Sequence, residues 1–270
     1  MDDVLVLAAM AVMLLVTGAA AGFLAGLFGV GGGIILVPAF FFVFSALGFD
    51  SPQLMQICLA TSLATIIVTS IRSVLAHDRK GAVDWSVLTS WGPGIVIGAL
   101  AGVFIVALLP SGLLQVIFGL LVVFVGLYMF LGQARWRLGR RMPTGIPRAG
   151  LSALTGFLSV LMGVGGGSLG VPVMTLYNTP IHRAVGTAAG FGFFIAVPSV
   201  IGFLLVDIAV APPLTFGAIN LAAFGLIVLM TLITAPIGAA TAHRMDPQPL
   251  RKFFGMFLVL VGLVMLWQAF

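Results

Sequence analysis

The stretch Gly29-Val30-Gly31-Gly32-Gly33 occurs a second time as Gly163-Val164-Gly165-Gly166-Gly167. Each copy follows a Gly-Phe-Leu triplet and precedes a Val-Pro pair, and the two copies match at a constant offset of 134 residues. Four glycines in five positions break a helix and let a ligand or another backbone approach closely. Inside a membrane, such a break is tolerated only where it is buried in protein or lines a polar cavity. We therefore expect an internal repeat with a functional helix break in each copy.

The composition indicates a protein that lies within a membrane. Hydrophobic residues make up 61% of the 270 residues and charged residues only 7%, with a mean hydropathy of +1.26. A soluble domain has about 25% charged residues. Apolar runs recur along the whole chain, so we expect an all-α polytopic membrane protein. The basic residues sit in short loops between these runs, which argues for topology signals and against a nucleic-acid-binding surface.

The apolar runs divide the chain into ten segments. A full membrane span needs about 20 residues, because a helix rises about 1.5 Å per residue and the hydrocarbon core is about 30 Å thick. The second segment is somewhat short and the seventh is too short to cross alone. Both directly follow a glycine stretch, so we expect each to be a short helix that starts near the membrane midplane. The ten segments are 4–28, 34–48, 54–75, 86–109, 113–132, 149–163, 168–178, 185–206, 213–242 and 252–269.

The positions of the basic residues predict the orientation in the membrane. If all ten segments cross and the N-terminus is outside, every Lys and Arg except Arg72 falls in an inside loop. Arg72 itself lies near the inside end of the third segment. Since positive charge is enriched on the cytoplasmic side, we expect a multi-pass membrane protein with its N-terminus outside. The inside loops are 76–85, 133–148, 179–184 and 243–252, and the outside loops are 49–53, 110–112 and 207–212.

The segments fall into two halves, a first repeat at residues 1–132 and a second at 149–270, joined by a basic cytoplasmic linker at 133–148. Each half holds five segments, and an odd number of crossings places the halves in opposite orientations. Inverted repeats with broken helices are a recurring plan of secondary transporters, which bind substrate where the repeats meet. Two further matches extend the repeat: Phe118-Gly119 with Phe254-Gly255, and Gly126-Leu127 with Gly262-Leu263.

Each glycine break presents the start of a short helix at membrane depth. A helix start leaves about four amide groups without partners and carries a partial positive charge of about +0.5, so it binds an anion without a charged side chain. Nearby hydroxyl groups can donate hydrogen bonds to an oxyanion, which favours a small oxygenated anion over a sugar, a peptide or a cation. The predicted substrate-binding residues are Gly29, Val30, Gly31, Gly32, Gly33, Ile34, Thr61, Ser62, Gly163, Val164, Gly165, Gly166, Gly167, Ser168, Arg183 and Thr187.

Other classes of function compete with a transporter. Glycines in membrane helices also serve close packing, so packing or a hinge is the simplest alternative for either break alone. An integral-membrane enzyme needs a clustered nucleophile, metal ligands or paired acids, whereas the sequence has three dispersed His, a single Cys and no Glu. We therefore expect no catalytic residue, no bound metal ion and no cofactor. An anion channel, a metal-cation permease and a scaffold stay open, as does the oligomeric state, for which a homodimer is one option.

The motifs resemble those of the TauE/SafE family of sulfite and sulfonate permeases. The resemblance is carried by the paired GVGGG stretches with their Val-Pro pairs, and it covers nearly the whole chain. It implies an inner-membrane carrier that exports sulfite, sulfoacetate or a related organosulfur anion. Three shorter stretches add to it: Ala60-Thr61-Ser62-Leu63, Gly81-Ala82-Val83-Asp84 and Ala184-Val185-Gly186-Thr187.

The shortage of acids bears on how such a carrier would be driven. All seven acidic residues are Asp, and they lie toward segment ends or in loops. Moving one charge across 100 mV is worth about 2.3 kcal/mol, so an anion leaving a cell that is negative inside needs no coupled proton. We therefore expect an electrogenic exporter that works by alternating access, with proton-coupled sulfonate uptake as the alternative.

Overall fold

The structure is a computed structural model and describes residues 2–28, 32–49, 51–131, 137–139, 141–242 and 247–269. These residues form ten α-helices and one short hairpin, which confirms the predicted all-α polytopic fold. Six of the helices are long and apolar enough to cross a membrane. The elements are α1 (Asp2–Phe28), α2 (Gly33–Ala46), α3 (Leu54–Asp78), α4 (Trp85–Leu108), α5 (Ser111–Leu131), α6 (Gly145–Leu161), α7 (Gly166–Leu176), α8 (Ile181–Leu204), β1 (Thr215–Phe216), β2 (Ile219–Asn220), α9 (Leu221–Ala242) and α10 (Pro247–Trp267).

Each predicted apolar segment corresponds to one helix, but α6, α8 and α10 begin before the predicted starts at 149, 185 and 252. The largest difference lies at the start of segment 213–242. There β1 and β2 form an antiparallel hairpin, and α9 begins only at Leu221. Gly217 turns the chain with a φ of +54°, a conformation that glycine adopts without steric cost. The hairpin holds Thr215, Gly217 and Asn220 and is less apolar than α9, but it is short and runs directly into that helix, so the apolar segment was predicted as one piece.

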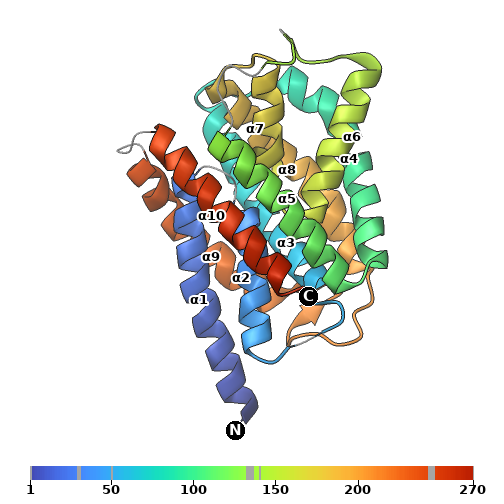
Figure 1. Ribbon diagram of the computed structural model, residues 1–270, viewed down its shortest axis with the longest axis vertical. Coiled ribbons are helices and arrows are strands. Elements are labelled where there is room, and N and C mark those ends of the chain that lie inside the picture. Colours follow the sequence, from blue (N-terminus) through green and yellow to red (C-terminus); the bar gives the residue numbers. More distant parts are fainter. Residues whose placement is uncertain are drawn as a thin grey trace.

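Helices α3 and α8 form the centre of the bundle. Of the six long helices, α3 is the most buried, with 78% of its apolar stretch enclosed. It runs antiparallel to α8, because Gly192 lies beside Ser70 and Gly186 lies beside His77. Helices α1 and α9 flank this centre on one side, and α4 and α6 flank it on the other (Figure 1).

The outer helices pack in pairs that join distant parts of the chain: α1 with α9, α6 with α4, and α5 with α10. Glycines allow these close approaches. A backbone carbonyl of the partner helix occupies the space where Gly26 of α1 or Gly98 of α4 would carry a Cβ atom. Between α5 and α10, a Cβ on Gly126 would lie 2.8 Å from the carbonyl oxygen of Gly255. Small residues thus set the distance between the helix axes, as is common in membrane bundles.

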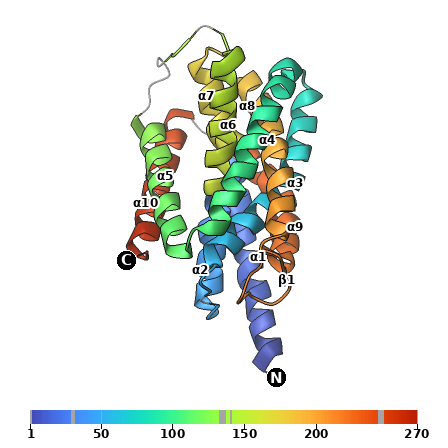
Figure 2. The same cartoon turned by 90° about the vertical axis from the view of Figure 1, so that its right-hand side faces the viewer.

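The connections between helices gather at two opposite ends of the bundle (Figure 2). At one end, which we call the basic end, lie connections 79–84, 137–139 and 177–180; the Leu138 amide there donates to the Leu176 carbonyl oxygen at 2.8 Å. At the opposite end, the Gln53 side chain donates to the Asp207 carbonyl oxygen at 3.0 Å. Arg79, Lys80, Arg137 and Arg183 lie at the basic end, while the described connections 47–49, 109–110 and 205–220 contain no Lys or Arg.

Helices α2 and α7 reach from the middle of the bundle to one end only. With 14 and 11 residues, they are about 21 Å and 16 Å long, shorter than the roughly 30 Å hydrocarbon core. Both begin beside Ile66, in the middle of α3: a Cβ on Gly33 or on Gly165 would lie 3.2 Å from the Ile66 side chain. Helix α2 then runs to the opposite end and α7 to the basic end (Figure 1).

Two helix starts are held in the same way by threonines of neighbouring helices. Asn220 and Asp84 precede α9 and α4, and the side-chain oxygen of each accepts a hydrogen bond from the amide three residues on, which is how N-cap residues satisfy free helix amides. The Asn220 amide donates to Oγ1 of Thr61 on α3 at 3.0 Å, and the Asp84 amide donates to Oγ1 of Thr187 on α8 at 2.8 Å. The threonines tie α3 to α9 and α8 to α4.

A methyl group at the α5–α10 contact should separate these helices. Gly126→Ala places a Cβ against the Gly255 carbonyl, and overpacking of this kind costs about 1–3 kcal/mol. Gly225→Ala in α9 makes the same chemical change with nothing within 4 Å of the new atom, so we expect it to leave stability unchanged or to raise it slightly. Thermal unfolding in detergent measures both variants, and an equal effect of the two would contradict this packing.

The threonine ties should contribute to stability through their hydroxyl groups. Thr61→Val keeps the shape of the side chain but leaves the buried Asn220 amide without its acceptor, which costs about 1–3 kcal/mol. We expect a smaller loss for Thr187→Val, since its hydrogen bond is only partly buried. Thr61→Ser is the matched control, because it keeps the hydroxyl. A melting temperature equally low for Thr61→Ser and Thr61→Val would show that the hydrogen bond is not the cause.

Candidate functional site

The second glycine stretch ends α6 and starts α7. Gly163 has a φ of +58° and its amide donates to the Val160 carbonyl oxygen at 3.0 Å, so the chain turns sharply there. Gly165 then forms the N-cap of α7 without any side-chain cap. The first amide groups of α7 therefore have no carbonyl of their own helix to bond, and they carry the positive end of the helix dipole.

Neighbouring helices pack so closely against this break that there is no room for a side chain at Gly166. A Cβ on Gly166 would lie 2.5 Å from Cβ of Phe191 and 2.7 Å from the Gly192 amide nitrogen, both on α8. From α3, Oγ of Ser62 donates to the Gly163 carbonyl oxygen at 2.8 Å. The break is thus held between α3 and α8 and away from lipid, the condition under which irregular backbone survives at membrane depth.

A cavity of about 80 Å³ lies at the start of α7, between α3 and α8. Gly165, Gly166 and Gly167 supply backbone to its lining, and α3 supplies the hydroxyl residues Thr69, Ser70 and Ser73. A water molecule needs about 10–15 Å³ of such space, so the cavity has room for several waters or a small anion. The other lining residues are Ile66, Val185, Ala189 and Gly192, and none of the ten is charged.

The first glycine stretch is placed differently. Gly29, Val30 and Gly31 lie outside the described residues. Gly32 is the N-cap of α2 with a φ of +75°, and the Gly163 carbonyl occupies the space that a Cβ on Gly33 would need. Gly33 and Ile34 are both buried. The two breaks therefore meet in the centre of the bundle, but the cavity is lined by the second break and not by Gly33 or Ile34.

The predicted hydroxyl residues lie near the breaks but do not line this cavity. Thr61 and Thr187 accept hydrogen bonds from the starts of α9 and α4, and Ser62 donates to the second break. Ser168, in the first turn of α7, is buried and has an interaction partner. Thr61, Ser62 and Thr187 thus connect the helices around the site.

The remaining predicted residues frame the cavity from a distance or through the backbone. Val164 is buried and its amide donates to the Ser159 carbonyl oxygen at 2.9 Å, which completes the turn after α6. Arg183 is exposed in the first turn of α8, at the basic end, two residues before the lining residue Val185. Within the part of the chain that the structure describes, no three His, Cys, Asp or Glu side chains gather as metal ligands would.

The hydroxyl groups of Thr69, Ser70 and Ser73 were missing from the sequence prediction. Thr69 and Ser70 donate to carbonyl oxygens of their own helix, at 3.2 Å to Thr65 and 3.3 Å to Ile67, as hydroxyl residues in membrane helices commonly do. Thr65, Thr69 and Ser73 recur every four residues and so share one helix face. That periodicity is the signal in the sequence that could have pointed to them.

Comparison with known proteins agrees with the architecture. The family model described as sulfite exporter TauE/SafE matches residues 14–265. A probable membrane transporter protein of Haemophilus influenzae is 30% identical over 93% of this chain and 96% of its own length. Similar proteins, also described as probable membrane transporters, occur in Methanocaldococcus jannaschii, at 25% identity over 94% of both chains, and in Bacillus subtilis, at 27% over 96% and 98%. No solved structure matches the chain.

The match extends over nearly the whole bundle, including both glycine breaks, the central helices α3 and α8 and the cavity between them. It agrees with a fold whose long helices are apolar enough to cross a membrane. The chain therefore belongs to the TauE/SafE sulfite exporter family and is a membrane transporter, not an enzyme.

Proposed function

We propose that this transporter exports a small organosulfur oxyanion, such as sulfite, sulfoacetate or a related sulfonate, and holds it at the start of α7. The observation that carries the proposal is the cavity between α3 and α8, into which a helix start and three hydroxyl residues converge. Free amides and hydroxyls donate hydrogen bonds to oxyanions. The absence of a carboxylate among the lining residues favours an anion over a cation.

The size of the cavity supports a compact substrate. About 80 Å³ holds a group of a few heavy atoms, whereas a drug-sized ligand occupies a pocket of about 300–1,000 Å³. The uncharged lining leaves the charge of the anion unpaired by side chains, so release is not opposed by a buried ion pair. Weak binding by uncharged groups suits a carrier, because a carrier must release its substrate on the other side of the membrane.

The charge distribution supports the direction of transport. The basic end of the bundle carries Arg79, Lys80, Arg137 and Arg183, and the cavity lies in the halves of α3 and α8 that point to that end. Under the positive-inside rule the basic end is cytoplasmic, so the cavity collects anions from the cytoplasm and the N-terminus is outside. An anion that leaves a cell negative inside gains about 2.3 kcal/mol per charge per 100 mV.

Residues 1–132 and 149–270 act in this proposal as two inverted repeats joined by the 133–148 linker. The pairing of helices supports this arrangement. If α1 to α5 are equivalent to α6 to α10 in order, then the α1–α9 pair is equivalent to the α6–α4 pair, and both pairs are present. The α5–α10 and α3–α8 pairs are each equivalent to themselves. The hydrogen bond from the start of α9 to Thr61 of α3 is likewise equivalent to the one from the start of α4 to Thr187 of α8. Alternating access then arises when one repeat moves against the other around the central breaks.

Binding of anions should stabilise the purified protein in detergent. A ligand present at about 100 times its dissociation constant raises the free energy of unfolding by about 2.7 kcal/mol. We expect a rise in melting temperature with sulfite, sulfoacetate or thiosulfate, and none with acetate, chloride or nickel at equal ionic strength. Taurine and sulfate complete the panel and separate zwitterionic from fully oxidised sulfur compounds. A shift produced by nickel alone would contradict the oxyanion site and favour the cation-permease alternative.

The cavity hydroxyls should control transport more than other hydroxyls of the bundle. Thr69→Val and Ser70→Ala each remove one hydroxyl group from the lining, which in this proposal turns from the carbonyl of its own helix to the anion. A hydrogen bond to a charged group is worth about 1.5–3 kcal/mol, or roughly tenfold or more in affinity. Efflux of the oxyanion from proteoliposomes under an imposed potential measures this loss. Thr89→Val is the matched control, because Thr89 also bonds its own helix but lies exposed on α4.

Two outcomes of the efflux experiment would contradict the proposal. Equal efflux from Thr69→Val, Ser70→Ala and Thr89→Val would show that the cavity is not on the transport path. Efflux that does not respond to the imposed potential, but does respond to a proton gradient, would favour proton-coupled movement of the anion instead.

A further inference from the structure

The threonine ties fix how α3 and α8 correspond to each other. Thr61 and Thr187 make the same contact to equivalent helix starts and lie 126 residues apart. With this offset Ile66 corresponds to Gly192, and these two residues touch: a Cβ on Gly192 would lie 3.4 Å from Cγ2 of Ile66. A local two-fold axis therefore passes near this contact. The cavity lies on the side of the axis that faces the basic end.

The two-fold axis relates each residue that lines the cavity on α3 or α8 to a residue of the other helix on the far side of the axis. Several of these related residues are larger than the residues that line the cavity. Val185 and Ala189 of the cavity correspond to Leu59 and Leu63, and Thr69 corresponds to Ile195. Each exchange replaces a smaller or more polar side chain by a larger aliphatic one. Ser70 and Ser73 correspond to Ala196 and Ser199.

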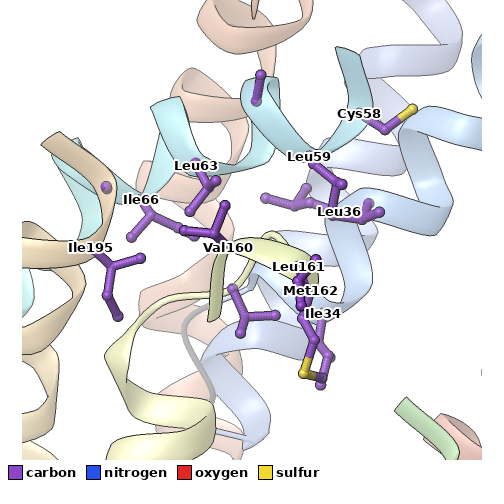
Figure 3. Close-up of a cluster of buried hydrophobic side chains, with 14 of the residues drawn as sticks. Ile34, Leu36, Cys58, Leu59, Leu63, Ile66, Val160, Leu161, Met162 and Ile195 are labelled. Carbon is purple, nitrogen blue, oxygen red and sulfur yellow. The ribbon is translucent and has the colours of Figure 1, made fainter. Parts of the chain in front are cut away.

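The larger side chains fill the space that is open on the cavity side. Leu59, Leu63 and Ile195, which we call the aliphatic plug, are fully buried. Figure 3 shows them in one cluster with Ile34 at the start of α2 and Val160 at the end of α6. The structure is therefore asymmetric at its centre, with a cavity lined in part by hydroxyl residues toward the basic end and a packed aliphatic layer toward the opposite end.

From this asymmetry we infer that the aliphatic plug is the gate that closes the substrate site toward the opposite end of the bundle. The inference rests on the proposed function, in that it takes the cavity as the substrate site. An ion cannot enter a layer of aliphatic side chains without losing its hydration, so the plug must part before the anion leaves. Leu59 contacts Gly163 directly, since a Cβ there would lie 3.0 Å from Leu59 Cδ2; a movement at this glycine therefore displaces the plug.

Accessibility of two equivalent serines to a thiol reagent tests the gate. Cys58 is buried and is the only cysteine, so Cys58→Ala provides a cysteine-free background. In that background, Ser73→Cys places a thiol in the cavity and Ser199→Cys places one at the corresponding position behind the plug. A membrane-impermeant methanethiosulfonate is added to inside-out and to right-side-out vesicles. We expect Ser73→Cys to react from the face of the basic end, and Ser199→Cys to react at least tenfold more slowly from either face.

Opening the plug should then expose the second serine position. Leu59→Val, Leu63→Ala and Ile195→Thr give the plug the residues of the cavity side, and together they should raise the labelling rate of Ser199→Cys from the opposite face at least tenfold. Ile195→Thr alone is the milder variant should the triple change unfold the protein. Leu114→Ala removes the same atoms as Leu63→Ala from a buried position in α5 outside the plug and should leave the rate unchanged.

The outcomes separate the gate from the substrate. Fast labelling of Ser199→Cys with the plug intact, or an unchanged slow rate in the folded plug variants, overturns the gate. Since the reagent needs no substrate, a tenfold rise in labelling supports the gate even if no sulfur oxyanion stabilises the protein, a result that would overturn only the proposed substrate. Stabilisation by sulfite with unchanged labelling would overturn the gate and leave the proposed function in place.

Discussion

A helix can begin in the middle of a membrane bundle only where something other than lipid meets its free amide groups. The start of α7 satisfies this condition through α3 and α8, which enclose it on two sides and leave a small cavity with three hydroxyl residues in its lining. The surrounding architecture serves this enclosure. Helices α1 with α9 and α4 with α6 lie outside the central pair, and glycines let each pair pack closely.

Much of this arrangement can be predicted from the sequence, because a bilayer limits the backbone structures that can span it. Segment length and hydropathy predicted the ten helices, and glycine stretches in front of short segments predicted that α2 and α7 start at the centre. The hairpin before α9 was not predicted because it is only a few residues long and runs directly into an apolar helix. The backbone of Gly165 to Gly167 was predicted as part of the site and does line the cavity.

The polar side chains of the site were harder to predict. A hydroxyl residue in a membrane helix can bond its own helix, cap a neighbour or face a ligand, and the same residue types serve all three roles. Substrate binding by Thr61 and Thr187 stays a prediction, and in the structure their hydroxyl oxygens accept hydrogen bonds from the starts of α9 and α4. Thr69 and Ser73 line the cavity because α3 turns that face toward α7 and α8, more than 90 residues later in the chain. The four-residue spacing of Thr65, Thr69 and Ser73 shows that they share one helix face, but it does not show which distant helices that face meets.

Helices of the first half pack against helices of the second half, and this also limits the order in which the contacts can form during synthesis. Gly26 of α1 packs against Ala235 of α9, 209 residues later in the chain, which takes on the order of 10–40 s to synthesise at about 5–20 residues per second. Gly98 of α4 meets Ala153 of α6 after only 55 residues. During biogenesis the glycine face of α1 is therefore without its α9 partner for most of synthesis, whereas the partners α4 and α6 are made close together. The first half is left incomplete until nearly the last helix has been inserted.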